Sequence, residues 1–536
     1  MKKLVSRLMA VLMAMTMILS MSMTAFAAEA SKGTLTVNNT VAGKTLDLYQ
    51  IFTATKNGDN VAYTLNSAYE GFFQSKITDA STLTGEALSE KAYAYVQEQV
   101  GETGSNGAAF AKDILGWILS VSGETKTAVE STHSTATTAD TKTVIDNLAY
   151  GYYVVYPLGA TDTSTAPGNE TVKSVASLVS VTGTDATVNM KSNYPTVVKK
   201  VNDKIADDVN IGDTVTYTLT SKVPDMTGYT SYVFNFKDTL SAGLTFKEIT
   251  SVTVGDTTIT KVDAGQEANN TYTLTQDGQN ITITMNNFLD SNKNNTGKEI
   301  KVTYTATLNK DAVTGFDANK NSATVEYSNK PGTDNKGESE PSIVDVHTFN
   351  FTIFKYYLKD ATKTGLANAE FELYKANGEV AGDKVNIKKV TDGEYRVATS
   401  EEAAAEGFKS DVIVSGNNGK VLVKGLGAGT YYLRETKAPE GYNKLLSDIK
   451  VEIKATYGAE GKLESYTVDY TYNGTTTQGT AITNKTDSPE VAVENKTGAQ
   501  LPSTGSKGAL MVTLAGIVLF GVLTASKAFG KKKANN

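Results

Sequence analysis

Between residues 28 and 486, short runs of alternating apolar and polar residues dominate the chain, and this pattern constrains the fold more than any other feature. The runs at 214–219, 281–285 and 302–308 have the two-residue period of a half-buried strand, and turns rich in Gly, Asn and Asp separate such runs. Helical periodicity is confined mainly to 88–100 and 108–121. We therefore predict a mainly β protein made of tandem β-sandwich domains, with some helix in the first domain.

The 536 residues are enough for three or four domains. We place one boundary near Tyr194-Pro195, because proline forces the preceding residue into an extended conformation. A second boundary falls near Glu340-Pro341, after a polar, turn-rich stretch. The predicted organisation is an N-terminal domain at 28–194, a middle domain at 195–345, a C-terminal domain at 346–486 and a flexible polar stalk at 487–500.

Composition argues against several classes of function. A net charge of −7 offers no basic surface for nucleic acid or for an anionic membrane. The chain has no cysteine, so a secreted form would depend on core packing or on another kind of cross-link. His133 and His347 are its two histidines, and their separation disfavours a histidine-based metal or catalytic site. We expect no cofactor and no metal, and we interpret the Asp- and Asn-rich segment 290–295 as a solvated turn rather than a calcium site.

The N-terminus has the layout of a secretory signal peptide, which we assign to residues 1–27. Lys2, Lys3 and Arg7 precede an apolar run, and Ala25-Phe26-Ala27 supplies small residues for cleavage. An uncleaved membrane anchor is the alternative, but the apolar run is short for one. We therefore predict a secreted, extracellular protein.

The C-terminal segment 501–536 carries a second targeting pattern. A pentapeptide precedes an apolar stretch at 509–525, and Lys531–Lys533 follow it, as in a segment that stops translocation. The pentapeptide resembles the LPxTG sorting signal of sortase substrates and consists of Leu501, Pro502, Ser503, Thr504 and Gly505. The resemblance implies that a sortase cleaves between Thr504 and Gly505 and transfers the acyl group to an amine, so that the apolar span is removed.

In two domains, a Lys, an acid and an Asn each lie on an otherwise apolar strand face. Residues i, i+2 and i+4 of a strand share a face, so these polar groups are expected to point into a core. The middle domain contributes Lys199, with Lys200 as a rival, Asp238 and Asn321. The C-terminal domain contributes Lys355, Glu435 and Asn484.

Two interpretations of these inward groups are open. Buried charges are normally paired, so each set could be a Lys–acid ion pair beside a hydrogen-bonded Asn. Alternatively, desolvation lowers the pKa of the lysine and raises that of the acid, and the neutral amine attacks the Asn carboxamide and expels ammonia. The product is an amide between side chains, formed once per chain, so the protein is not a turnover enzyme.

The segment 431–442 resembles the YxLxETxAPxGY E-box of collagen-adhesin B-type (Cna-B) domains, which are immunoglobulin-like sandwiches. The resemblance implies that Glu435 is the catalytic acid and that Lys355 and Asn484 form an isopeptide bond. The N-terminal domain has a strand at 151–155 that is similar to a B-type strand, but no acid follows it. We expect a B-like fold there without a bond.

The middle domain is similar to the A-type partner domain of the same adhesins. This resemblance implies that Asp238 is the acid and that Lys199 and Asn321 are the bonded pair. We expect each bond to join the first strand of its sandwich to the last.

Together, the signal peptide, the sandwiches and the sorting signal resemble the backbone, or major, pilins of Gram-positive bacteria. The resemblance implies a shaft subunit of a cell-wall-anchored pilus, in which a class C sortase joins copies of the chain head to tail. A housekeeping sortase would then attach the polymer to peptidoglycan. Minor pilins and host surface ligands are further partners that the resemblance leaves open.

The lysine that accepts the next subunit commonly follows Tyr-Pro in this family, but Thr196 follows Tyr194-Pro195 here. Lys191 is the candidate acceptor, because it ends the predicted strand 186–190 on the solvent side. Lys200 and Lys199 are the alternatives.

Two other functions compete with the shaft subunit. A non-polymerising LPxTG-anchored adhesin would share every feature except the acceptor lysine, but the chain shows neither tandem repeats nor a large ligand-binding region. A cell-surface hydrolase would need an acid pair or a nucleophile–base set in a cleft, and the acids that we can place are assigned to isopeptide chemistry.

Overall fold

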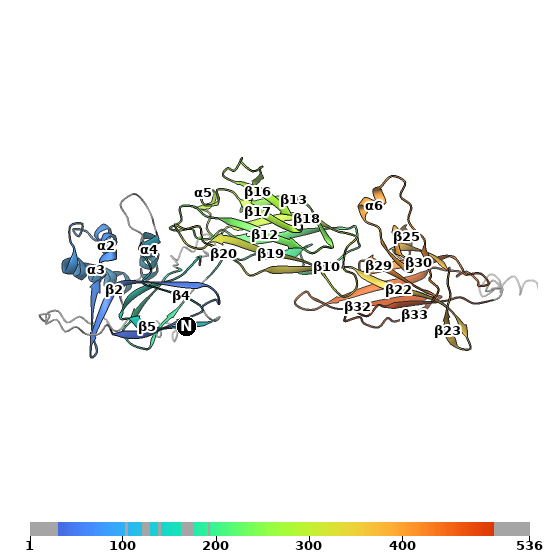
Figure 1. Cartoon of the computed structure of the whole chain (residues 1–536), viewed down its shortest axis with the longest axis horizontal. Helices are drawn as coiled ribbons and strands as arrows, with labels where there is room; N and C mark the ends of the chain where they lie inside the picture. Colours follow the sequence, from blue (N-terminus) through green and yellow to red (C-terminus); the bar gives the residue numbers. More distant parts are fainter. Residues whose placement is uncertain are drawn as a thin grey trace, which may run out of the picture. The chain divides into compact units, whose positions relative to one another are not determined.

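The computed structural model describes residues 31–101, 106–119, 129–137, 141–161, 175–190 and 193–497. These residues form two compact units. The first unit holds the N-terminal and middle domains, and the second holds the C-terminal domain together with the segments 208–213 and 312–318. Figure 1 shows the predominance of strands in every domain, so the predicted mainly β fold is confirmed.

The N-terminal domain contains one sheet that is buried on both faces. Its order is β3-β2-β6-β7, with β4 paired to β2, and a second sheet has the order β5-β1-β8. Leu48 and Val155 pack toward the second sheet, whereas Tyr49 and Val154 pack against the helices. A strand buried on both faces carries apolar residues without alternation, and β6 is buried at every position. The predicted helices are confirmed as α3 and α4 (Figure 1).

The elements of this domain are β1 Lys32–Asn38, β2 Thr45–Asn57, β3 Asn60–Leu65, η1 Ser67–Tyr69, α2 Glu70–Lys76, α3 Gly85–Val100, α4 Gly107–Leu119, β4 His133–Ala136, β5 Lys142–Ala149, β6 Gly151–Pro157, β7 Ser177–Val181 and β8 Ala186–Asn189.

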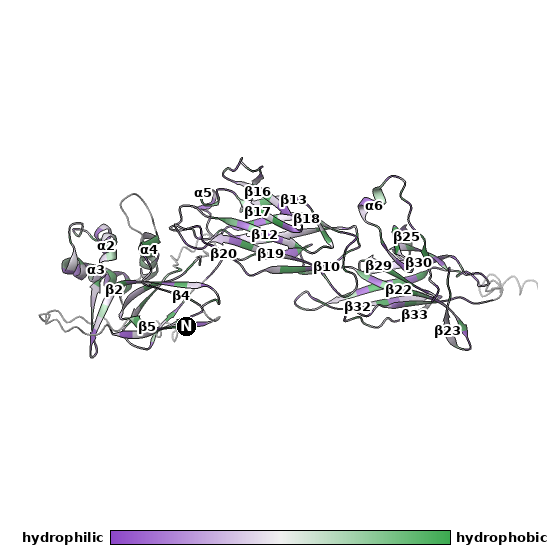
Figure 2. Cartoon of the chain, viewed as in Figure 1, coloured by the Kyte–Doolittle hydropathy of each residue, from purple (hydrophilic) through white to green (hydrophobic). Residues whose placement is uncertain are grey.

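The middle domain is a sandwich of two sheets. One has the order β14-β13-β18-β11-β9, and the other has the order β10-β21-β19-β12-β17-β16-β15, with β20 paired to β19. Apolar and polar residues alternate along its strands, as Figure 2 shows by colour, because only one face of each sheet lies in the core. The predicted middle domain at 195–345 includes most of β21, which follows Pro341 and pairs with β19 from Asn319 to Ala323, and the first compact unit ends at Val346.

The elements of the middle domain are β9 Val198–Val201, β10 Ala206–Asp208, β11 Thr214–Lys222, β12 Phe234–Leu240, β13 Leu244–Val254, β14 Thr257–Thr258, β15 Thr260–Lys261, β16 Thr271–Asp277, β17 Asn280–Met285, α5 Phe288–Asn292, β18 Glu299–Leu308, β19 Asn319–Ser328, β20 Lys336–Glu338 and β21 Ser342–His347.

The C-terminal domain is also a two-sheet sandwich. Its sheets have the orders β23-β22-β29-β27-β26, with β34 paired to β22, and β25-β24-β30-β31-β32-β33, with β28 paired to β24. The predicted end of this domain at residue 486 and the stalk at 487–500 are wrong over the described residues. The segment Glu490–Glu494 is a strand that pairs in parallel with Thr352–Tyr356 and completes the sheet.

The elements of the C-terminal domain are β22 Phe349–Lys359, β23 Thr362–Gly365, β24 Glu370–Asn377, β25 Val380–Lys384, β26 Ile387–Thr391, β27 Glu394–Val397, α6 Ser400–Ala404, β28 Ile413–Val414, β29 Lys420–Leu426, β30 Gly429–Lys437, β31 Ile449–Tyr457, β32 Leu463–Tyr472, β33 Thr475–Thr477 and β34 Glu490–Glu494.

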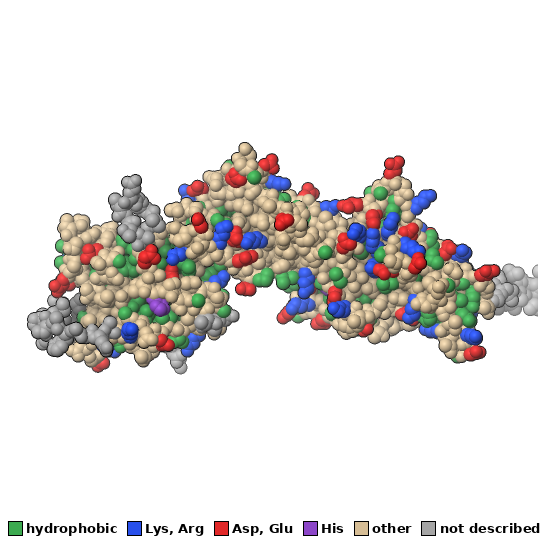
Figure 3. Space-filling view, viewed as in Figure 1, with side chains coloured by type: hydrophobic (Ala, Val, Ile, Leu, Met, Phe, Trp, Pro, Cys, Tyr) green, Lys and Arg blue, Asp and Glu red, His purple; other side chains and the backbone are tan. Residues whose placement is uncertain are grey.

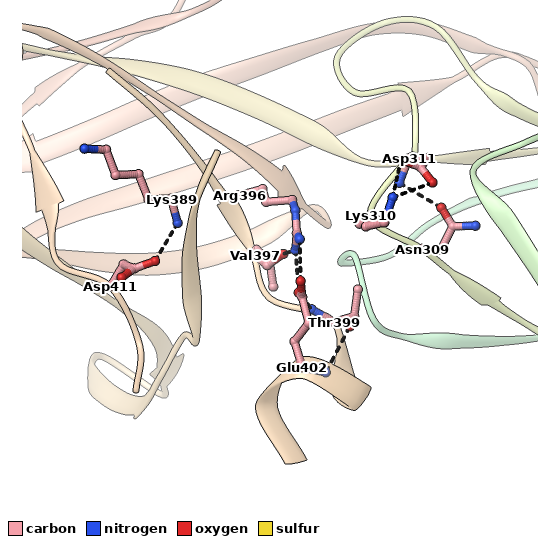
Figure 4. A network of polar contacts seen from close by, with 9 residues as sticks. All are labelled: Asn309, Lys310, Asp311, Lys389, Arg396, Val397, Thr399, Glu402 and Asp411. Atoms are coloured by element: carbon pink, nitrogen blue, oxygen red, sulfur yellow. Dashed lines mark hydrogen bonds and ion pairs between the residues drawn. The ribbon is translucent and has the colours of Figure 1, made fainter. Parts of the chain in front are cut away.

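A short helix in the C-terminal domain is held by its first turn. The Thr399 side chain accepts a hydrogen bond from the Glu402 amide, and the Glu402 carboxylate accepts one from the Thr399 amide, which makes a capping box for α6. Arg396 binds both carboxylate oxygens of Glu402, at 2.6 and 2.7 Å (Figure 4). The same Arg396 contact lowers the pKa of Glu402 to about 2.

Acidic and basic side chains are interspersed over the face of the C-terminal domain drawn in Figure 3. The charged side chains of this domain also form ion pairs, including Lys384–Glu372 at 2.7 Å and Arg434–Asp448 at 2.7 Å. This face therefore shows no extended field of a single sign. Within the described part of the chain, no helix is both long and apolar enough to cross a membrane, and the apolar stretch 509–525 lies outside that part.

Candidate functional site

The C-terminal domain buries a cluster of Lys355, Glu435 and Asn495. The Lys355 amine lies 3.0 Å from Glu435 Oε1, and neither side chain has any exposed surface. Lys355 Nζ also donates a hydrogen bond to Asn495 Oδ1, and Asn495 Nδ2 donates to Glu435 Oε1 at 3.2 Å. The amine, the acid and the carboxamide therefore contact one another directly.

Three strands position these groups. Lys355 follows Phe351 and Ile353 on the inward face of β22, and Glu435 ends the inward face of β30, as the alternation predicted. The backbone amide of Leu445 donates to Glu435 Oε2 at 2.8 Å and fixes the carboxylate. Asn495 comes directly after β34, which pairs with β22 alongside Lys355.

The sequence prediction of Asn484 as the partner of Lys355 is wrong for this structure. Asn484 is exposed and bonds locally to Thr486 and Asp487. Ile482, two residues earlier, is buried but forms only an isolated bridge with Tyr466, so no strand carries Asn484 inward. The sequence analysis did not predict Asn495, although Val491 and Val493 precede it on one strand face. An apolar face that ends in a polar residue is the pattern by which Lys355 and Glu435 were predicted.

The second cluster lies in the middle domain and contains four polar side chains. Lys199 pairs with Asp238 Oδ2, and the exposed fractions of the two side chains are 0% and 1%. The Tyr304 hydroxyl lies 2.7 Å from Lys199 Nζ and 2.8 Å from Asp238 Oδ2. Asn321 Nδ2 donates to the same hydroxyl at 2.7 Å. The three predicted residues are thus brought together, and Tyr304 is an addition that the sequence analysis missed.

Strand positions explain this cluster. Lys199 is buried on β9 between Val197 and Val201, whereas Lys200 faces solvent, which decides between the two lysines. Asp238 lies on the inward face of β12 and Asn321 on that of β19, which are neighbours in one sheet. Lys199 comes from the opposite sheet. Because β20 and β21 follow β19, Asn321 is not on the last strand of the sandwich, contrary to the expectation.

Burial lowers the pKa of both lysines below that of an exposed lysine. Desolvation lowers the pKa of Lys199 to about 8, although Asp238 opposes the shift. Desolvation likewise lowers the pKa of Lys355 to about 8, with Glu435 opposing it. Burial also raises the pKa of Asp238. In the middle domain, a neutral Lys199 amine beside a protonated Asp238 is thus more accessible than it would be in water.

The other predicted residues have different surroundings. No lysine is buried among the described residues of the N-terminal domain. Lys191 and the sorting motif Leu501–Gly505 lie outside the described residues, as does the signal peptide 1–27. In the described part of the chain, no group of three or more His, Asp or Glu residues is arranged to hold a metal ion.

Two stretches of the chain match known protein families. Residues 353–467 match the SpaA prealbumin-like fold domain. Residues 211–331 match the Cna-B-like domain of Gram-positive pilin backbone subunit 2. The second description is B-like, whereas the sequence resemblance implied an A-type domain at this position.

Known proteins are similar over a larger part of the chain. Fimbrial subunit type 2 of Actinomyces naeslundii is 27% identical over 367 residues, which cover 64% of this chain and 61% of that protein. The trypsin-resistant surface T6 protein of Streptococcus pyogenes serotype M6 is 26% identical over 322 residues, which cover 52% of this chain and 50% of that protein. The chain thus matches less than two thirds of the length of either relative. The solved T6 backbone pilin of serotype M6 aligns with 88% of this chain and 100% of its own, at 16% identity and a TM-score of 0.47.

The fold and the two clusters define a tandem β-sandwich protein in which two sandwiches each bury a Lys, an acid and an Asn. The two domain matches and the two similar proteins show that this chain is similar to the backbone pilins of Gram-positive bacteria over part of its length.

Proposed function

We propose that this chain is the structural shaft subunit of a covalently polymerised, cell-wall-anchored pilus, and that each buried cluster closes into a Lys–Asn isopeptide bond. The observation that carries the proposal is the contact of the Lys355 amine with the Asn495 carboxamide, with Glu435 hydrogen-bonded to both. In this arrangement a nucleophile, an electrophile and a proton carrier already lie within bonding reach.

The bonds would suit a fibre under tension. Lys355 lies on the first strand of the C-terminal domain, and Asn495 follows its last strand, 140 residues later. A covalent link there lets force bypass nearly the whole domain. In the middle domain, a Lys199–Asn321 bond would join the two sheets and bypass 321 − 199 = 122 residues. These links would replace the disulfides that a chain without cysteine cannot form.

Polymerisation would use the two ends of the subunit. A class C sortase would cleave after Thr504 and join it to a lysine of the next copy, and a housekeeping sortase would attach the chain to peptidoglycan. We propose Lys191 as the acceptor and Lys200, which is exposed, as the alternative. Lys199 cannot serve, because its amine is enclosed in the core.

Expression of the full chain with a class C sortase in a Gram-positive host tests the proposal. A ladder of SDS-resistant multimers is expected, and Thr504→Ala should remove it. Lys191→Arg should also remove the ladder, whereas Lys200→Arg should leave it unchanged. A wall-attached monomer without a ladder would instead indicate a non-polymerising adhesin. Intact mass spectrometry of the secreted chain should show a deficit of two ammonia molecules.

A further inference from the structure

The two clusters differ in how the acid is connected to the lysine and the asparagine. In the C-terminal domain, Glu435 Oε1 is 3.0 Å from Lys355 Nζ and 3.2 Å from Asn495 Nδ2, so one oxygen serves both reacting residues. In the middle domain the acid is Asp238, whose side chain is one methylene shorter. Its Oδ2 contacts Lys199 and Tyr304, and its Oδ1 has no hydrogen-bond partner among the described residues.

The Tyr304 hydroxyl fills the gap between this shorter acid and the carboxamide. It accepts a hydrogen bond from Asn321 Nδ2 at 2.7 Å and donates one to Asp238 Oδ2 at 2.8 Å. It also lies 2.7 Å from Lys199 Nζ. Every hydrogen bond by which Asn321 reaches the Lys199–Asp238 pair therefore passes through this one oxygen.

The tyrosine is held firmly in this position. It lies on the inward face of β18 between Val302 and Ala306, and its exposed fraction is 1%. Its ring stacks on that of Tyr217, with centroids 5.1 Å apart and an interplanar angle of 22°. Burial raises the pKa of its hydroxyl well above the usual range, so the group keeps its proton and remains able to donate.

We propose that Tyr304 is a catalytic residue of the middle-domain reaction, and that its hydroxyl relays a proton from Asp238 to the departing nitrogen of Asn321. This inference rests on the proposed isopeptide bond. Asp238 with Tyr304 would do the work that Glu435 does alone in the C-terminal domain.

Proton transfers along the relay precede the loss of ammonia, and a further transfer follows it. The Lys199 ammonium passes one proton to Asp238, and the neutral amine attacks Cγ of Asn321. Asp238 then gives its proton to the Tyr304 oxygen, while the Tyr304 hydroxyl gives its own proton to Nδ2 of Asn321. The bond between Cγ and Nδ2 breaks and ammonia leaves. The new amide nitrogen returns one proton to Asp238, and Tyr304 ends as it began.

Tyr304→Phe removes only the hydroxyl and keeps the stacked ring. The full-length chain is recovered unfolded in denaturant and refolded by dilution with mild detergent, and samples are quenched with acid over time. Intact mass counts the ammonia lost, and peptide mapping distinguishes the Lys199–Asn321 link from the Lys355–Asn495 link. The C-terminal bond in the same molecule is the internal control, and Tyr272→Phe is a matched substitution at a buried tyrosine outside the cluster.

We expect Tyr304→Phe to slow the middle-domain bond roughly 10²–10⁴-fold, the usual contribution of a positioned proton donor, while the C-terminal bond forms at the wild-type rate. Tyr272→Phe should form both bonds normally. An unchanged middle-domain rate in Tyr304→Phe would overturn the relay and leave the isopeptide proposal intact. A wild-type chain that loses no ammonia would overturn the isopeptide proposal itself.

A second pair of variants tests the relay from the side of the acid. Asp238→Glu lengthens the acid so that it can reach Asn321 directly, as Glu435 reaches Asn495. In this background the hydroxyl should be dispensable, so Asp238→Glu and Asp238→Glu/Tyr304→Phe should form the middle-domain bond at similar rates. The relay is contradicted if the middle-domain bond forms much more slowly in the double variant than in Asp238→Glu, because a longer acid would then not replace the hydroxyl.

Discussion

Asn495→Ala should remove the C-terminal cross-link without removing any other interaction that contributes as much to the free energy of unfolding. The Asn495 carboxamide is the group that Lys355 would attack, and it contacts Lys355 and Glu435. The substitution leaves the Lys355–Glu435 ion pair in place, so no buried charge loses its partner. The matched control is Asn484→Ala, which truncates an exposed asparagine of the same domain.

The size of the effect follows from the span of the link. Lys355 and Asn495 are 140 residues apart, and closing a loop of that length in the unfolded chain corresponds to about 5 kcal/mol. Loss of the Asn495 hydrogen bonds adds about 1 kcal/mol. Because 1 kcal/mol shifts the melting temperature of a domain of this size by about 2–4 °C, we expect the C-terminal transition to fall by about 12–24 °C.

Calorimetry of the secreted chain measures this transition separately from those of the other domains, which a multidomain chain requires. Intact mass should rise by one ammonia in Asn495→Ala and stay unchanged in Asn484→Ala, once the mass of each substitution itself is subtracted. The reasoning fails if Asn495→Ala keeps the full ammonia deficit, or if Asn484→Ala is the variant that loses part of it. A melting temperature unchanged by loss of the bond would refute the loop-closure magnitude.

Three further predictions concern the acids. Asp238→Ala should abolish only the middle-domain bond and Glu435→Ala only the C-terminal one, so a variant that loses both bonds by peptide mapping would show that the two reactions are not independent. The reactive state of the middle domain holds one proton shared between Lys199 and Asp238. When the chain is refolded at different pH values, the rate of middle-domain bond formation should be flat near neutrality, fall above about pH 8 as Lys199 deprotonates, and fall at acid pH where both groups are protonated. A bond-formation rate that keeps rising above pH 8 would mean that no acid is needed. Glu402→Gln should cost about 1 kcal/mol of C-terminal domain stability at neutral pH, because it weakens both the capping box and the Arg396 contact. The pKa of Glu402 is lowered to about 2 in the folded chain. The difference in the free energy of urea unfolding between wild type and Glu402→Gln should therefore persist down to about pH 4 and vanish as the pH falls through 2. A difference that survives below pH 2 would contradict the stabilising role of the ionised Glu402 carboxylate.

Strand alternation alone identified most members of both clusters. It placed Lys199 on a face with Val197 and Val201 but left Lys200 open as a rival until the structure showed Lys200 exposed, and it placed Glu435 at the end of an apolar face. The two-residue period is a local property of a strand, so it can be read directly from the chain. Likewise α3 and α4 of the first domain were found from their 3.6-residue period, which is also a local property, whereas the short helix α2 was not.

The sequence did not determine which asparagine Lys355 meets. Ile482 with Asn484 and Val493 with Asn495 show the same local alternation, and only the pairing of β34 with β22 brings the second of them to the lysine. Pairing between strands more than 130 residues apart depends on the packing of the whole sandwich. The mistaken stalk at 487–500 has the same origin, because a short strand with a polar flank resembles a linker until its partner is known.

The contacts of the Tyr304 hydroxyl could not be predicted from the sequence. The alternation at 302–308 predicted a half-buried strand, and the structure places Tyr304 on its inward face, as one of several buried tyrosines of the domain. That its hydroxyl lies between Asp238 and Asn321 depends on how β9, β12, β18 and β19 meet across the two sheets. The sequence by itself thus determined which faces point inward, whereas the tertiary structure decided which inward groups touch, because contact across a core depends on distances that no local period encodes.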